Sequence, residues 1–337
     1  MRTMLRPLCI ALCLALPLAA QKAPGLKLAT LLPKGGAQYQ LLEEMKESFA
    51  KAAGGGAKLT ILADYHEGES AMVDKMRLGG LQAGLISIVG LTQIESKAAG
   101  LQYLPMMLRS LDELDQVKQK LATALERRLE AKGFVVLFWS DAGWLRFFSR
   151  KPIRTPADLK RQKLFNWAGD TAQYDLMKKH GYDPIPLEPA DTKGALATGM
   201  LDAVAAVPFL ALGHQYYAEA KYMLEIDWAP LVGAMVVTRQ RWDSIPEATR
   251  SDLRRIATEY GSKITAKSRQ ENVDSVQAMV GKHGLVVTKP AAGELDEWTQ
   301  MAAGLWPEIR GKIVPADVFD EVQQILAECR KQGSSGK

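Results

Sequence analysis

The feature that most constrains this chain of 337 residues is an alternation of short apolar runs with longer stretches of helical period. The apolar runs over 26–31, 59–63, 85–89 and 134–139 have the length and composition of buried strands. Such alternation is typical of α/β proteins with largely parallel sheets, because a crossover helix must return the chain to the start of the next strand. We therefore predict an α/β fold.

The same pattern continues through the second half of the chain. Further strands are predicted over 163–167, 203–207, 231–238 and 285–288. Helices are predicted over 38–53, 70–82, 111–132, 171–180 and 193–198. A chain of this length exceeds what one hydrophobic core usually organises, so two lobes are expected.

A long stretch without proline follows Pro246 and ends near His283. Leu253, Ile256 and Ile264 recur in it at helical spacing. One helix of this length would span roughly 50 Å, which is longer than one lobe is wide. We prefer a single helix lying across both lobes, and two helices broken at Gly261 are the alternative.

The first 20 residues are organised as a secretory signal peptide, with a basic start, an apolar run over 8–16 and small residues before the expected cleavage site after Ala20. The run is much shorter than the roughly 20 residues of a membrane-spanning helix. We therefore predict a cleaved signal and a periplasmic mature protein. Two of the three cysteines leave with this segment, so Cys329 has no partner for an intrachain disulfide.

Charge and motifs exclude several function classes. The formal net charge is +5, and loss of Arg2 and Arg6 with the signal leaves 5 − 2 = +3, without any basic run, so no nucleic-acid partner is expected. The four histidines lack metal-ligand spacing. No phosphate-binding glycine loop and no serine nucleophile elbow occurs. We predict no metal, no cofactor and no enzymatic activity.

Several segments resemble the TRAP-transporter periplasmic solute-binding proteins, a C4-dicarboxylate-receptor-like family. The clearest is Arg150–Leu164, RKPIRTPADLKRQKL, which resembles a proline-containing signature of that family. GESAMVDKMRLGGLQAGL over 68–85, the turn over 197–203 and Trp-x-x-Ile-Pro over 242–246 are similar to further family segments. The matches follow the family's order along the chain.

The resemblance implies a two-lobed receptor that closes on its ligand by a hinge motion and delivers it to integral membrane permease subunits. We expect a monomer. The predicted division is a signal peptide over 1–20, lobe I over 25–142 plus about 231–265, lobe II over 143–230 plus about 266–330, and a flexible tail over 331–337.

The chain departs from the family where the family contacts its ligand. The resemblance implies an arginine that binds a ligand carboxylate with two hydrogen bonds, and this chain has Phe165 there. Family members often carry acidic and amide side chains where this chain reads AVAAVPF over 203–209. We therefore predict an apolar, aromatic cleft without a salt bridge to a small carboxylate.

The predicted cleft leaves Arg146 as the candidate charged anchor, with the register open between it and Leu145. The predicted ligand-binding residues are Trp144, Arg146, Phe165, Asn166, Trp167, Ala206, Val207, Phe209 and Trp228. The expected ligand is hydrophobic or amphipathic, such as a fatty acid, an isoprenoid, a lipid fragment or a long-chain monocarboxylate. Apolar burial at roughly 25 cal/mol per Å² would supply the affinity.

Three alternatives remain from the sequence. The first is a periplasmic lipid carrier or chaperone that keeps the fold without a permease. The second is an ordinary receptor for small organic acids. The third is a secreted enzyme, which would need an acid, a base or a nucleophile assembled in the cleft.

Overall fold

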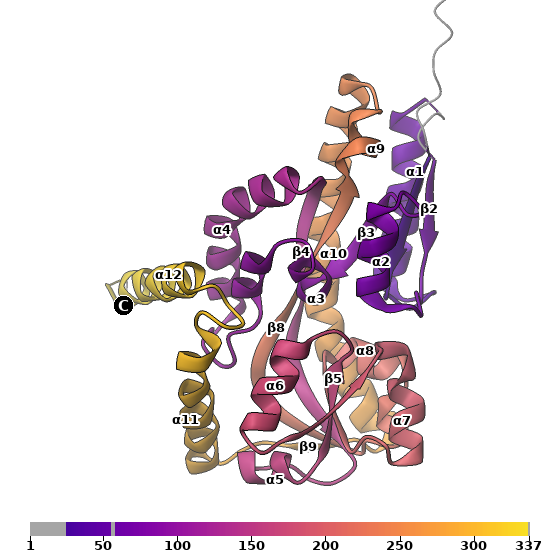
Figure 1. Cartoon of the computed structure of the whole chain (residues 1–337). Helices are drawn as coiled ribbons and strands as arrows, with labels where there is room; N and C mark the ends of the chain where they lie inside the picture. The colour runs from indigo at the N-terminus through magenta and orange to yellow at the C-terminus, as the bar shows by residue number, and fades with distance from the viewer. Residues whose placement is uncertain (1–24, 55–57, 336–337) are drawn as a thin grey trace, which may run out of the picture.

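The computed structural model describes residues 25–54 and 58–335, so the predicted signal peptide lies outside the described residues. The chain forms two lobes, and the long helix α10 (Glu247–His283) runs along both (Figure 1). Helices α1 (Ala37–Ala52) and α2 (Gly68–Arg77) belong to lobe I, and α6 (Thr171–Lys179) and α7 (Thr192–Thr198) belong to lobe II. The predicted α/β fold with two lobes is confirmed.

One mixed sheet connects the lobes in the order β2-β1-β3-β8-β4-β7-β5-β6, with β9 paired to β8. Its strands are β1 (Leu26–Thr30), β2 (Leu59–Leu62), β3 (Ala83–Ser87), β4 (Phe134–Ser149), β5 (Lys163–Trp167), β6 (Asp183–Leu187), β7 (Ala203–Ala206), β8 (Tyr222–Thr238) and β9 (Val286–Thr288). β1 is parallel to β2 and β3 in lobe I, and β5 is parallel to β6 and β7 in lobe II. The antiparallel pair β4 and β8 joins these two parallel groups.

Strands β4 and β8 are 16 and 17 residues long, two to three times the predicted lengths. Their pairing shifts register between Asp141 and Trp144 and again between Leu145 and Phe147. Such bulges break the alternation of side chains, which is the signal that sequence analysis follows. Strand β6 was not predicted, because it contains Pro184 and Pro186; it lies at the edge of the sheet, where proline is tolerated.

The remaining helices cover the sheet and its connections. They are α3 (Ile88–Thr92), α4 (Leu111–Ala131), α5 (Pro156–Lys160), α8 (Pro208–Gly213), α9 (Arg239–Asp243), α11 (Ala292–Ile309) and α12 (Ala316–Ser335), with the 3₁₀ turns η1 (Ser96–Leu101), η2 (Pro189–Asp191) and η3 (Tyr216–Ala218). The structure continues α12 to Ser335, where the sequence indicated a flexible tail from 331. In the described part of the chain, no helix has the length and hydropathy needed to cross a membrane.

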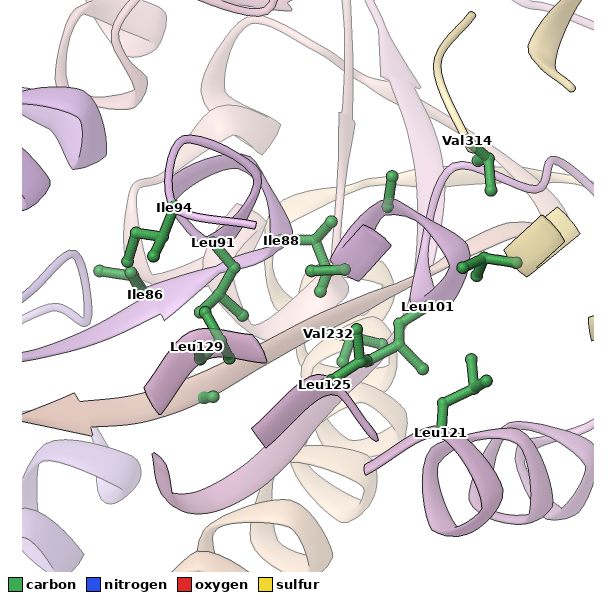
Figure 2. Packing of buried hydrophobic residues seen from close by; sticks show 14 of the residues in the cluster. Ile86, Ile88, Leu91, Ile94, Leu101, Leu121, Leu125, Leu129, Val232 and Val314 are labelled. Atoms are coloured by element: carbon green, nitrogen blue, oxygen red, sulfur yellow. The ribbon is translucent and has the colours of Figure 1, made fainter. Parts of the chain in front are cut away.

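The core of lobe I lies between the sheet, α3 and α4 (Figure 2). Leu121, Leu125 and Leu129 project from one face of α4 toward this core, as the helical spacing of the sequence predicts. Apolar residues of α12, including Val322 and Leu326, join the same cluster. The C-terminal helix therefore packs on lobe I, whereas the sequence-based division placed this region up to 330 in lobe II.

Helix α10 is continuous over 37 residues, which corresponds to about 55 Å at 1.5 Å per residue. The alternative of two helices broken at Gly261 is wrong. Gly261 lies inside the helix, where it contacts the ring of Phe138 on β4. A glycine at this position permits the helix to approach the sheet closely.

Gly261→Ala is expected to lower the free energy of unfolding by about 1–2 kcal/mol, because the added Cβ would lie within 2.6 Å of a ring carbon of Phe138. Gly281 is the matched control, since it lies in the same helix with no atom near its added Cβ. Gly281→Ala should raise stability by about 0.5–1 kcal/mol through helix propensity. Urea denaturation measures both changes. Equal stabilisation by the two substitutions would contradict the close packing.

Candidate functional site

Two adjoining cavities lie at the cleft between the lobes. We call one the polar cavity, because Asp64, Asp170 and Tyr216 are among its lining residues; its volume is about 240 Å³. We call the other the apolar cavity, because its lining includes Leu164 and Met301; its volume is about 140 Å³. The two cavities share the lining residues Gln102, Tyr103, Leu145, Phe165, Gln173 and Ala205. A single ligand could therefore extend from one cavity into the other.

The polar cavity lies where parallel strands end. Leu31 follows β1, Val89 follows β3, Trp167 ends β5, and Val207 follows β7, and all four line this cavity. The carboxyl ends of parallel strands are the usual place for ligands in α/β folds, since the loops there leave a crevice. The two parallel groups of strands thus direct their ends toward one cleft.

Helix α11 forms a wall of the apolar cavity through Met301, Leu305 and Ile309. Two indole groups hold the helix in place. Trp298 Nε1 donates to the carbonyl oxygen of Arg154 in lobe II at 2.7 Å, and Trp306 Nε1 donates to that of Pro105 in lobe I at 3.0 Å. Because α11 is hydrogen-bonded to both lobes, the position of this wall of the cavity depends on the position of one lobe relative to the other.

A hydrogen bond crosses the polar cavity from lobe to lobe. The hydroxyl of Tyr103 donates to Asp170 Oδ2 at 2.5 Å, and the backbone N–H of Gln173 donates to Asp170 Oδ1 at 3.1 Å. Burial raises the pKa of Asp170, although the Tyr103 bond opposes this effect. Burial also raises the pKa of Tyr103, and the Asp170 charge adds to this increase. Burial therefore favours the neutral form of Asp170, and the Tyr103 hydrogen bond favours its ionised form.

No lysine or arginine is among the described residues that line these two cavities. Their charged lining groups are Asp64 and Asp170, and the histidines there are His66, His180 and His214. Burial lowers the pKa of His214, so this ring is neutral near pH 7. The part of the chain that the structure describes thus supplies no guanidinium or ammonium group to the lining, the groups that usually pair with a ligand carboxylate.

Most of the predicted site residues line the cleft. Phe165, Trp167, Ala206 and Val207 line the polar cavity, and Phe165 and Trp228 line the apolar one. The Nε1 atom of Trp167 is buried without a hydrogen-bond partner among the described residues, so it is available to a ligand atom.

Two further predicted residues lie at the margin of the cleft. Phe209 lines an adjoining hollow that shares Trp167 with the polar cavity. Asn166 lines neither of the two cavities. It is buried, and its Nδ2 donates to the carbonyl oxygens of Trp167 at 2.9 Å and of Asp170 at 3.2 Å. Asn166 therefore shapes the turn that positions Trp167 and Asp170.

Trp144 and Arg146, also predicted to bind the ligand, line neither of the two cavities. Both line a separate hollow beside α10, and Arg146 forms ion pairs with Glu225 and Asp227 at 3.4 Å each. Leu145 lines the ligand cavities instead. Adjacent residues on a strand point to opposite faces of the sheet. A shift of one residue in register therefore decides whether Leu145 or Arg146 faces the cavities.

Sequence analysis missed the polar residues of the site, among them Asp64, Tyr103, Asp170 and Gln173. One signal was present, because Asp170 follows a strand and a glycine and then caps α6. Tyr103 lies in a loop without periodicity and had no such signal. Within the described residues, no group of three or more His, Cys, Asp or Glu side chains could hold a metal ion.

Glu188 of lobe II lies against Gly68 at the start of α2 in lobe I. Its Oε2 atom is buried and has no hydrogen-bond partner among the described residues. Burial, followed by the charges of Glu69 and Asp191, raises the pKa of Glu188 to about 7. An ionised Glu188 therefore destabilises this contact between the lobes.

The Glu188 contact should make stability depend on pH. The carboxyl has a higher pKa in the folded state, about 7, than in the unfolded state, 4.5, so the folded state holds its proton longer. The stabilisation is full below pH 4.5 and is lost as the pH rises through 7. Allowing for solvent screening, we expect a loss of about 1 kcal/mol. The melting temperature should therefore fall between pH 5 and pH 8. Glu188→Gln should remove the part of this fall that ionisation of Glu188 causes.

The control for this measurement is Glu219→Gln, which changes an exposed carboxylate on the same lobe. It should leave the pH profile of the melting temperature unchanged. Equal profiles for wild type and Glu188→Gln would contradict a protonated Glu188 in the folded protein.

Comparisons with known proteins agree with this architecture. Residues 28–312 match the model of a family described as bacterial extracellular solute-binding protein, family 7. The chain is 23% identical over 301 residues to the C4-dicarboxylate-binding periplasmic protein DctP of Rhodobacter capsulatus, which covers 88% of this chain and 87% of that protein. It is 24% identical over 252 residues to the 2,3-diketo-L-gulonate-binding periplasmic protein YiaO of Escherichia coli, covering 71% and 74%.

Solved structures show the same fold. The sugar acid binding protein DctPAm of Advenella mimigardefordensis, in complex with galactonate, superposes with a TM-score of 0.84 at 15% identity, covering 91% of this chain and 99% of that chain. A TRAP periplasmic solute-binding protein of Shewanella oneidensis with bound succinate gives a TM-score of 0.82 at 16% identity, covering 90% and 99%. Because the family model matches most of its length, the chain belongs to family 7 of the bacterial extracellular solute-binding proteins, the family of the TRAP-type receptors.

Proposed function

We propose that the protein is the periplasmic solute receptor of a TRAP-type transporter, and that its ligand is apolar or amphipathic. The closed, liganded form would be the form that the permease subunits bind. The permease partnership and the location rest on the family. The ligand class rests on the cleft, where Phe165 and Leu145 border both cavities and no described lining residue is a lysine or an arginine.

The observation that carries the proposal is the lining of the cleft. Two connected cavities whose described lining residues include no lysine or arginine would leave a ligand carboxylate without a charge partner in a partly desolvated site. Burying an unpaired charge costs several kcal/mol, so a small dicarboxylate would bind poorly. Burial of apolar ligand surface against Phe165, Leu164 and Trp228 would favour binding at roughly 25 cal/mol per Å².

A second candidate is a receptor for small organic acids. It is favoured by the related structures with bound galactonate and succinate. In this chain such a ligand would have to use neutral donors, such as Trp167 Nε1 and the amide of Gln102, in place of an arginine. A carrier that works without a permease would have the same cleft, and only its partner would differ.

Isothermal titration calorimetry on ligand-free protein separates the two ligand classes. The titrants are 1-octanol, as a neutral amphiphile, and succinate and galactonate, as small acids. We expect saturable binding of 1-octanol with a negative heat-capacity change, which marks apolar burial, and no binding of the two acids. Binding of either acid with micromolar affinity, without binding of 1-octanol, would show that this is an ordinary organic-acid receptor.

A further inference from the structure

We propose that Glu188 forms a pH-dependent latch between the lobes: its carboxyl binds a proton when lobe II closes against lobe I and releases that proton when the lobes separate. Acidification should therefore favour the closed form, the form in which a ligand is enclosed. This inference goes beyond the proposed function, because it concerns the balance between open and closed protein and does not depend on the ligand class.

The contact is close because lobe I has a glycine where lobe II presents the carboxyl. Glu188 follows β6, and Gly68 is the first residue of α2. A Cβ atom at Gly68 would lie 2.1 Å from Glu188 Oε2, so the carboxyl occupies space that a side chain would fill. Gly169 of lobe II approaches Ser70 similarly, since a Cβ atom there would lie 3.1 Å from Ser70 Oγ. Two segments of lobe II thus pack against the first turn of α2.

The carboxyl of Glu188 has no positive partner at this contact. Its Oε2 atom is buried and accepts no hydrogen bond from the described residues. Of the described groups, those whose charges act on Glu188 are Glu69 and Asp191, and both are acidic. An ionised Glu188 would therefore be a partly desolvated charge without a counter-ion, whereas a protonated Glu188 is neutral. The closed contact favours the protonated form.

The charged groups at the start of α2 are engaged elsewhere. Glu67 accepts a hydrogen bond from Lys75 Nζ at 2.5 Å, so this lysine is paired with its own helix. Glu69 accepts from the backbone N–H and from the hydroxyl of Ser87, both at 2.7 Å. Burial raises the pKa of Glu69, and its hydrogen bonds oppose this effect. Whether ionised or neutral, Glu69 gives Glu188 no positive charge.

The groups on the lobe II side also leave Glu188 without a cation. Asp191 of η2 is acidic, and the Nζ atom of Lys193 in α7 donates to Gln215 at 2.9 Å. Pro189, the residue after Glu188, lines the polar cavity. The titratable residues described in the same lining are Asp64, Tyr65, His66, Tyr103, Asp170, His214 and Tyr216.

Closure should take up a proton between pH 4.5 and pH 7. Burial, followed by the charges of Glu69 and Asp191, raises the pKa of Glu188 to about 7 at the contact. With the lobes apart the carboxyl is solvated, and its ordinary pKa is 4.5. The latch is therefore fully effective below pH 4.5 and is lost as the pH rises through 7. Allowing for solvent screening, we expect a ratio of closed to open protein about fivefold higher at pH 5 than at pH 8.

Single-molecule fluorescence energy transfer tests the latch on protein without ligand. The dyes are attached to Leu78→Cys in lobe I and Ala197→Cys in lobe II, both at exposed positions, in a Cys329→Ser protein expressed from Gln21. We expect the ratio of closed to open protein to fall about fivefold from pH 5 to pH 8, and to stay constant in Glu188→Gln, which keeps a neutral side chain. Equal ratios at the two pH values without the Glu188 substitution would overturn the latch, and so would the same fall in Glu188→Gln.

Two control variants separate the latch from general effects. Glu219→Gln removes an exposed carboxylate of the same lobe and should keep the fivefold fall. Gly68→Ala places a Cβ atom against Glu188 and should lower the closed fraction at both pH values. Gly181→Ala is its match, because Gly181 has a similar φ, 78° against 80°, and no atom near its added Cβ. Equal closure of the Gly68→Ala and Gly181→Ala proteins would show that the contact takes no part in closing the lobes.

Discussion

Replacing Asp141 with alanine is expected to lower the free energy of unfolding by about 3–5 kcal/mol, the loss typical of breaking a buried ion pair. The Asp141 side chain is fully buried at the crossing between the lobes. Arg269 of α10 donates to both of its oxygens, at 2.9 and 2.7 Å, and Lys118 of α4 also pairs with it. The substitution leaves these two cations with Asp115 as their remaining partner.

This cluster connects three elements, because Arg269 also binds Asp115 of α4 through two nitrogens, at 2.9 and 2.7 Å. Its loss should loosen α10 from both β4 and α4. Urea denaturation followed by circular dichroism measures the change. Asp296→Ala, at an exposed position on α11, is the control and should shift stability by less than about 0.5 kcal/mol. A loss below about 1 kcal/mol for Asp141→Ala would contradict the role assigned to the cluster.

Phe165→Arg is expected to weaken binding of 1-octanol about 100-fold and to create binding of succinate. The side chain of Phe165 borders both cavities, so a guanidinium there would put a charge into the apolar cavity, at a cost of several kcal/mol without a counter-ion. A ligand carboxylate would supply that counter-ion through two parallel hydrogen bonds. Calorimetry with both compounds measures the exchange.

The matched control is Phe165→Leu, which keeps an apolar side chain at the same place. It should retain binding of 1-octanol within about tenfold and show no binding of succinate. If Phe165→Arg and wild type have the same ligand preference, the residue does not determine specificity.

Elements with a strong periodic pattern were predictable, and elements defined by long-range packing were not. The helix over 247–283 and the strand over 163–167 follow from apolar spacing and from the position of prolines. Phe165 and Trp167 were predicted to lie in the cleft because the resemblance places the family's ligand-binding arginine at position 165, on this strand. Leu145 could not be chosen over Arg146, because the bulges of β4 reset the direction of its side chains.

The wall formed by α11 shows a second limit of sequence analysis. Met301, Leu305 and Ile309 have helical spacing, but spacing alone does not show which surface the helix covers. The contact of Glu188 with Gly68 joins residues 120 positions apart along the chain (188 − 68). Its consequence for pH dependence depends on burial that only the folded structure shows.

The central claim is that this receptor binds a solute through an apolar cleft rather than through an arginine–carboxylate pair. Native mass spectrometry of the mature protein, purified from its own bacterial host, tests it most directly when followed by organic extraction and identification of the bound molecule. We expect a bound amphipathic molecule that is absent from the Phe165→Arg variant. A bound C4-dicarboxylate or sugar acid that depends on Phe165 would contradict it.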